Sequence, residues 1–117
     1  MQRKDLPVGD ALHTPPLSLE NAHVVITRAW MVGRVRYARH FGARCQERGF
    51  TTVDVGNVLR TGRIWGEAEY CPEFRNWKYR IRATVEEELL EVVVALDPNE
   101  DYELAPLVVL ITIYRKT

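Results

Sequence analysis

The sequence places one histidine and two arginines four residues apart in a short basic segment. His40, Arg44 and Arg48 follow one another at helical spacing, and Glu47 is the only acid in residues 28–48. On a helix these three positions span only about 80° of the surface, so their side chains can face one ligand. A histidine moves protons near neutral pH, and guanidinium groups bind phosphate and stabilise developing negative charge. This set suits metal-free RNA cleavage, which needs a base for the 2′-hydroxyl and a cation for the phosphorane.

The same spacing also fits a solvated helix face whose arginines pair with acids elsewhere in the chain. Residues 86–103 hold eight acids and no lysine or arginine, although the net charge of the whole chain is zero. Basic and acidic surfaces can therefore coexist, but overall basicity gives no argument for nucleic acid. The H-x3-R-x3-R spacing by itself leaves both interpretations open.

A strand-like segment in the second half carries further candidates for RNA binding. In residues 76–82, Lys78, Arg80 and Arg82 alternate with apolar residues and so share one face of a half-buried strand. Such a basic face is either simply solvated or, next to a basic helix, a surface for RNA.

The last apolar segment, residues 107–114, adds Thr112 and Tyr114 on one side of a strand. If that side faces His40, the two hydroxyl groups can hydrogen-bond a substrate or orient the histidine. Packing in the core or at a sheet edge is the competing explanation for Tyr114.

The elements expected to position these residues are helices followed by strands. Apolar periodicity and capping residues predict helices over residues 19–31, 39–48 and 51–61. Strands are predicted over residues 63–70, 76–82, 89–96 and 107–114, with a short strand or extended link at 34–38. Short links between consecutive strands favour an antiparallel meander. We therefore expect an α+β fold with N-terminal helices packed on a four-stranded, mainly antiparallel sheet.

A length of 117 residues indicates one domain, which we place at residues 18–117. Residues 1–17 contain three prolines and read as an irregular arm that can contact a partner or a second copy of the chain. A homo-oligomer is therefore one possible assembly.

Several classes of protein are disfavoured by what the sequence lacks. Cys45 and Cys71 are isolated and read as a reduced pair, and the dispersed histidines do not suggest a metal site. The glycines do not fit phosphate-loop or dinucleotide spacing, so we expect no cofactor. No signal peptide or membrane-spanning segment is evident, which favours a cytoplasmic protein without a membrane partner.

The stretch "RHFGARCQERGFTTVDVGNVLRTGRI", followed by "WKYRIRA", "LLEVVVAL" and "LVVLITIY", resembles the domain-of-unknown-function family 4258. The resemblance covers about residues 19–115 and is most specific over residues 40–62. The positions that fit the family pattern there are His40, Arg44, Arg48, Gly49, Asp54, Val55, Val58, Leu59 and Gly62.

Members of this family look like the wider group of RelE-like and colicin-like toxin ribonucleases that act beside an antitoxin. The resemblance implies a RelE-like two-layer fold, RNA as substrate and an antitoxin protein as partner. It implies a metal-independent ribonuclease in which His40 is the general acid or base and Arg44 and Arg48 bind the phosphate, with Tyr114 as a further catalytic residue. The alternative functions are a non-catalytic module that binds RNA or protein, and a structural or immunity role in a larger complex.

Overall fold

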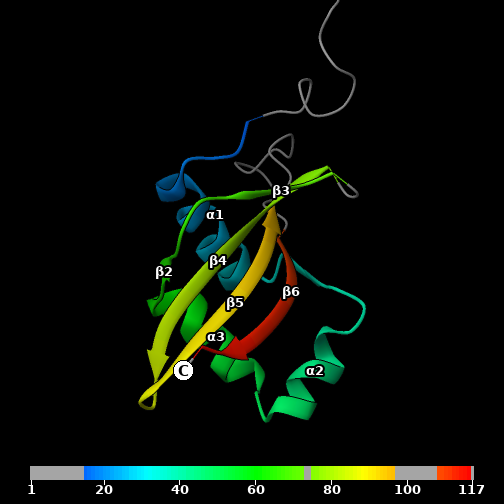
Figure 1. Ribbon diagram of the computed structural model, residues 1–117, viewed down its shortest axis with the longest axis vertical. Coiled ribbons are helices and arrows are strands. Elements are labelled where there is room, and N and C mark those ends of the chain that lie inside the picture. The colour runs from blue at the N-terminus through cyan, green and yellow to red at the C-terminus, as the bar shows by residue number, and fades with distance from the viewer. Residues whose placement is uncertain (1–14, 73–74, 97–107, 117) are drawn as a thin grey trace, which may run out of the picture.

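A computed structural model describes residues 15–72, 75–96 and 108–116 of the chain. Within these ranges, helices cover one face of an open six-stranded sheet (Figure 1). The helices are α1 (Leu19–Val32), α2 (Phe41–Arg48) and α3 (Thr52–Thr61). The strands are β1 (Val35–Tyr37), β2 (Arg63–Ile64), β3 (Glu69–Cys71), β4 (Asn76–Val85), β5 (Glu88–Leu96) and β6 (Val108–Arg115).

The helix ends follow from local sequence signals. The Ser18 side chain accepts a hydrogen bond from the backbone of Asn21 at the start of α1, and Gly33 ends that helix with a φ of 76°. Thr51 and Asp54 form a reciprocal capping box at the start of α3. These signals confirm the predicted helices to within about two residues. None of the helices in the described ranges has both the length and the apolar character needed to cross a membrane.

The sheet differs from the predicted one in its number of strands. Its order is β1-β6-β5-β4-β2, with β3 also paired to β4, so the expectation of four strands is wrong. The predicted strand at 63–70 is two short strands, because the chain turns at Gly66, whose φ is 75°. Both short strands pair antiparallel with β4, at different positions along it.

The antiparallel meander of β4, β5 and β6 is confirmed by the strand register. The addition is β1, which pairs in parallel with the first part of β6, Val35 lying opposite Val108 and Tyr37 opposite Leu110. This pairing brings the segment just before α2 to the edge of the sheet. As a result α2 lies beside β6, while α1 and α3 cover the face of the sheet (Figure 1).

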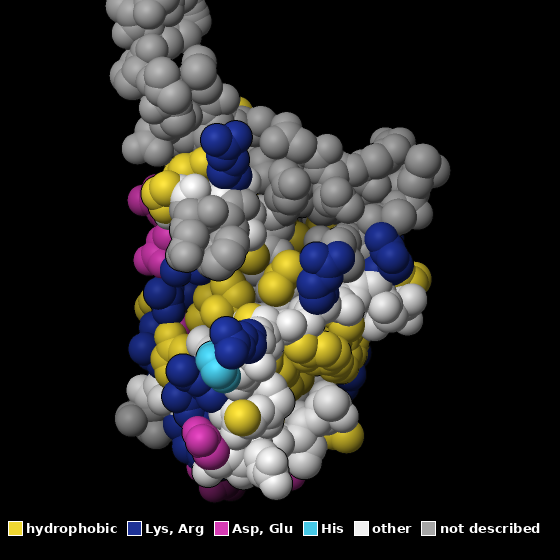
Figure 2. Space-filling model, turned by 90° about the vertical axis from the view of Figure 1, so that its right-hand side faces the viewer, with side chains coloured by type: hydrophobic (Ala, Val, Ile, Leu, Met, Phe, Trp, Pro, Cys, Tyr) yellow, Lys and Arg dark blue, Asp and Glu magenta, His cyan; other side chains and the backbone are white. Residues whose placement is uncertain are grey.

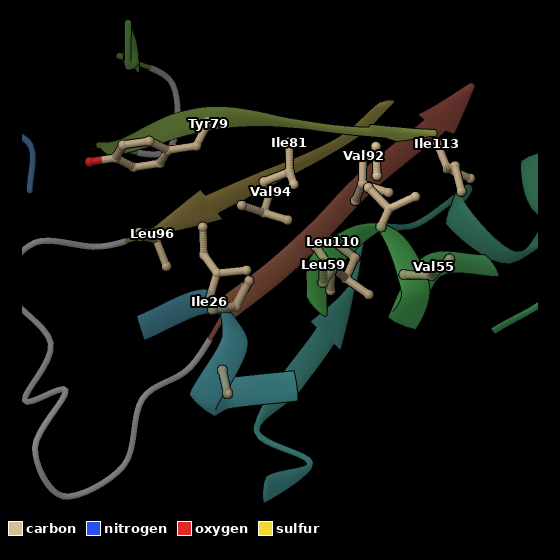
Figure 3. Close-up of a cluster of buried hydrophobic side chains, with 14 of the residues drawn as sticks. Ile26, Val55, Leu59, Tyr79, Ile81, Val92, Val94, Leu96, Leu110 and Ile113 are labelled. Carbon is tan, nitrogen blue, oxygen red and sulfur yellow. The ribbon is translucent and has the colours of Figure 1, made fainter. Parts of the chain in front are cut away.

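The hydrophobic core lies between this helical layer and the sheet. Figure 3 shows Ile26 of α1 and Leu59 of α3 directed at residues of the central strands, including Val92. Tyr79 is also buried there, and its hydroxyl donates to the backbone oxygen of Leu17, 2.9 Å away. Leu17 belongs to the predicted arm, whose first fourteen residues lie outside the described ranges.

The contact between α1 and α3 explains why a glycine stands at position 56, in the middle of a helix. A Cβ at this position would lie 2.9 Å from Nε1 of the Trp30 ring. The mid-helix glycine, which costs about 1 kcal/mol of helix propensity, therefore allows the tryptophan of α1 to pack directly on α3.

Candidate functional site

The residues expected to do chemistry lie on α2 and on the sheet face opposite the helical layer. Along β4, the buried residues Tyr79, Ile81 and Ala83 alternate with the partly exposed Arg80 and Arg82. This alternation confirms that the basic residues of the strand share the face that the helices leave uncovered. We call this surface the open face.

The start of α2 presents His40 and Arg44 to solvent. His40 occupies the N-cap position, so α2 begins at Phe41. The sequence predicted a start two residues earlier, at residue 39. The buried Phe41 anchors this end, and Gly49 closes the other end with a φ of 77°. Within the described ranges, neither the His40 nor the Arg44 side chain has a hydrogen bond or ion pair. Both groups are therefore available to a ligand.

Arg48 has a different environment from the other two residues of the motif. Its Nη1 donates to the backbone oxygen of Ile113 at 2.8 Å and to Oγ1 of Thr112 at 3.2 Å. These contacts are possible because β1 pairs only with residues 108–110, so that within the described residues no strand pairs with the later part of β6 on that side. Arg48 thus ties α2 to that edge and gives one of its carbonyl groups a partner.

The helical rise also separates Arg48 from His40. Eight residues at 1.5 Å each place the two positions about 12 Å apart along the axis of α2. His40 and Arg44 are one turn apart and can contact the same phosphate group. The motif therefore divides into an exposed pair and a residue that holds α2 on the sheet.

A buried carboxylate occupies the middle of the open face. Glu91 of β5 is 0% exposed, although it lies on the face without helices. Its Oε1 accepts from Nε of Arg82 at 2.7 Å, and its Oε2 accepts from Nη1 of Arg80 at 2.9 Å. The Tyr114 hydroxyl also donates to Oε2, and it accepts from Nη1 of Arg80 at 2.7 Å. We call these four residues the Glu91 cluster.

The Glu91 cluster is held in one protonation state. Burial alone would raise the pKa of the Glu91 carboxyl, but hydrogen bonds from Tyr114, Arg82 and Arg80 outweigh that effect and lower it. Burial and the contact with the carboxylate both raise the pKa of Tyr114. The proton therefore stays on Tyr114, and the charges of the two arginines are largely balanced by Glu91 and by Glu69, which contacts Nη2 of Arg80 at 3.1 Å.

Sequence reasoning missed Glu91. The only signal was a single acid inside the apolar run "LLEVVVAL", in a strand next to one with alternating arginines. The register supplies what the sequence lacks, because it places Glu91 opposite both Arg82 and Tyr114.

Lys78 lies outside the Glu91 cluster, at a hollow near one end of the open face. The hollow has a volume of about 610 Å³ and runs from the β1 edge across β6 and β5 to β4 and β3. Its charged lining residues are Arg36, Arg39 and Lys78. Figure 2 shows the side of the molecule that carries α2, where basic side chains gather around a histidine and border an apolar strip.

The structure therefore sorts the expected site residues into four places. His40 and Arg44 lie at the start of α2. Lys78 lines the hollow together with residues 36–39, the segment that leads into α2. The Glu91 cluster takes Arg80, Arg82 and Tyr114, while Thr112 binds Arg48. Among the described residues, no group of three histidine, cysteine or acidic side chains is placed to hold a metal ion.

A family model described as Domain of unknown function (DUF4258) matches residues 37–115. The chain belongs to this family. The DUF4258 match begins at the end of β1, so α1 lies outside it and the match is shorter than the expected range of about residues 19–115. No curated protein and no solved structure matches the chain.

The DUF4258 region contains the exposed pair on α2, the Glu91 cluster and all lining residues of the hollow except Arg36. The family description names no activity. The chemistry of this member must therefore be inferred from its own side chains.

Proposed function

We propose that this DUF4258 protein is a small metal-independent ribonuclease of toxin type. The observation that supports the proposal is the exposure of His40 and Arg44, one helical turn apart, beside a basic hollow on an open sheet face. An imidazole and a guanidinium so placed can act on one phosphodiester group.

In the proposed reaction, His40 accepts the proton of the RNA 2′-hydroxyl. The 2′-oxygen then bonds to phosphorus, the P–O5′ bond breaks, and His40 returns the proton to the leaving O5′. Arg44 binds the non-bridging phosphate oxygens, whose negative charge increases in the phosphorane. The products are a 2′,3′-cyclic phosphate and a 5′-hydroxyl. Arg48 and Tyr114 support this site by fixing α2 and the open face.

The test is cleavage of single-stranded RNA by the purified full chain in the presence of EDTA. We expect cyclic-phosphate ends with the wild type and a loss of at least about a hundredfold in rate with His40→Ala, the usual value of a general acid or base. Because the His40 side chain is exposed and has no hydrogen bond, ion pair or ring contact with the described residues, the variant should unfold at nearly the same temperature as the wild type. A folded His40→Ala protein that cleaves at the wild-type rate would refute the assigned role.

A matched control distinguishes the loss of one positive charge anywhere in the protein from the loss of a charge at the proposed site. Arg60 lies on α3, where it bonds Asn57 and not the open face, so Arg60→Gln should leave cleavage unchanged. Arg44→Gln removes the same charge from the proposed site and should lower the rate.

A non-catalytic module that binds RNA or protein is the second candidate function. The observation in its favour is that Arg48 and Tyr114 are engaged by bonds within the protein. This function predicts binding that weakens with salt, and no cleavage product from any RNA.

The proposed toxin would need a protein antitoxin as partner. An antitoxin that inhibits by occlusion should cover the open face and the start of α2. We therefore expect RNA and antitoxin to compete for the protein, and Arg44→Gln to weaken both complexes.

A further inference from the structure

The hollow at the end of the open face has the composition of a binding site for a planar anionic ligand. Its floor is formed by small and branched apolar side chains from β5 and β6, namely Ala95, Val109 and Ile111. Tyr37 also borders the hollow, but its register partner is the buried Leu110 and its ring packs against Phe41, so its side chain lies toward the helical layer. The apolar floor by itself suits one face of a flat ring system, which it would desolvate.

The rim of the hollow is cationic. Arg36 and Arg39 lie on the β1 side and Lys78 lies on the β4 side, and no acidic residue lines the hollow among the described residues. Glu69 is opposite Lys78 in the β3–β4 register, but its carboxylate binds Arg80. The rim therefore keeps its positive charge, in contrast to the Glu91 cluster a few residues further along β4.

A third feature is an unsatisfied polar atom at the β3–β4 end. The Oδ1 atom of Asn76 is buried and has no hydrogen-bond partner within the described residues. Asn76 lines the hollow and is two residues from Lys78, so both side chains lie on the open face. Leaving such an atom unpaired costs about 1–3 kcal/mol. Because Oδ1 is buried, a ligand recovers this energy only when the amide turns toward the hollow, where it can offer Oδ1 to a donor or its NH₂ group to an acceptor.

We propose that this hollow binds one nucleotide of a single-stranded RNA. The base lies on the floor of Ala95, Val109 and Ile111, the Asn76 amide hydrogen-bonds the edge of the base, and the basic rim binds the phosphate. Arg39 directly precedes His40, so the bound nucleotide is next to the proposed reacting phosphate. This inference rests on the proposed action on RNA and names the subsite that would select a base there.

The test is direct binding of small ligands to the full chain carrying His40→Ala, so that no cleavage interferes. The four ribonucleoside 3′-monophosphates, the corresponding nucleosides and inorganic phosphate are titrated by calorimetry, and by NMR of the amides that line the hollow. We expect at least one nucleotide to bind about tenfold or more tightly than both its nucleoside and inorganic phosphate, because the floor and the rim act together.

Two variants divide the contributions of base and phosphate. Asn76→Ala should weaken the preferred nucleotide about tenfold and reduce the difference between bases, without changing the affinity for inorganic phosphate. Lys78→Gln should weaken the nucleotide and inorganic phosphate alike. Arg60→Gln, which removes one charge on the helical side, should bind as the parent does.

Three results would overturn the subsite: nucleotides that bind no better than inorganic phosphate, Lys78→Gln indistinguishable from Arg60→Gln, or a folded Asn76→Ala protein with unchanged binding of every nucleotide. The outcome is separable from that of the proposed reaction. Nucleotide binding here without RNA cleavage by the wild type would refute the ribonuclease and retain the subsite, and cleavage without such binding would do the reverse.

Discussion

Glu91 shows how one side chain decides the character of the open face. The two neighbouring strands supply its partners, Arg80 and Arg82 from β4 and Tyr114 from β6, and no water-exposed surface remains on the carboxylate. A buried charge is tolerated only when it is paired and hydrogen-bonded in this way. Arg80 and Arg82, two of the residues expected to bind RNA, are consequently bound to a carboxylate of the protein itself.

Replacing Glu91 should therefore affect stability strongly. Glu91→Gln leaves Arg80 and Arg82 without their carboxylate, and we expect a loss of about 3 kcal/mol in the free energy of unfolding. This is the lower end for a broken buried pair, because the Arg80 side chain remains 32% exposed. Glu88→Gln, which removes an exposed pair with Arg115, should cost less than about 1 kcal/mol. Chemical denaturation of the three proteins measures both values.

The same variant tests how the stabilisation by Glu91 depends on pH. Because folding lowers the pKa of Glu91 below its ordinary value of 4.5, the stabilisation is present above that pH and is lost as the pH falls through the folded pKa. The difference in stability between wild type and Glu91→Gln should narrow on acidification. A difference that stays constant down to the acid transition, or a loss no larger than that of Glu88→Gln, would contradict this account.

At the scale of elements, close backbone packing fixes where α3 joins the sheet. Gly62 ends α3, and a Cβ there would lie 2.5 Å from the backbone oxygen of Val58 and 2.6 Å from that of Arg82. Neither carbonyl can move without breaking the last turn of α3 or the β2–β4 pairing. Any residue can adopt the φ of −85° found at this position, so backbone conformation does not require a glycine here. The close contacts of a Cβ atom do.

Gly62→Ala should destabilise the protein by at least about 2 kcal/mol, as expected of an overpacked buried site. Gly42→Ala is the matched control, because a Cβ on α2 at that position would meet nothing within 4 Å. The control should be neutral or stabilise by up to about 1 kcal/mol through helix propensity. Thermal unfolding of both variants gives the comparison, and equal effects would refute the contact argument.

At the scale of the whole molecule, a chain with no net charge presents a basic region on one side. Arg36, Arg39 and Lys78 around the hollow and Arg44 on α2 have no ion pair with a described acid, whereas Glu88 and Glu91 are paired on the sheet. Affinity for RNA should therefore depend on a few local contacts and not on the overall field.

The salt dependence of RNA binding tests this distribution. Four contacts, from Arg36, Arg39 and Lys78 at the hollow and from Arg44 on α2, predict that the logarithm of the affinity for single-stranded RNA falls by about 2.8 per tenfold rise in salt, at roughly 0.7 per contact. Lys78→Gln should lower that slope by about 0.7, and Arg60→Gln should leave it unchanged. Fluorescence anisotropy with labelled RNA and the His40→Ala protein measures the slopes. A slope near zero, or one equally affected by both variants, would argue against phosphate binding at the hollow.

The sequence by itself determined the features that depend on neighbouring residues. Short segments are sufficient to predict the helix ends at Ser18, Gly33 and Thr51. The same is true of the alternation along β4 and of the DUF4258 motif around His40. Capping and periodicity act over a few residues, so local patterns are sufficient to predict them.

The tertiary structure decided the features that join distant segments. The parallel pairing of β1 with β6 links residues more than seventy positions apart, and it is this pairing that positions α2 and closes one side of the hollow. Burial of Glu91 required the register of three strands, and the unpaired amide of Asn76 became visible only once its surroundings were known. Strand register and side-chain burial depend on contacts that no local pattern encodes, so the charges available to a ligand could be assigned only from the folded chain.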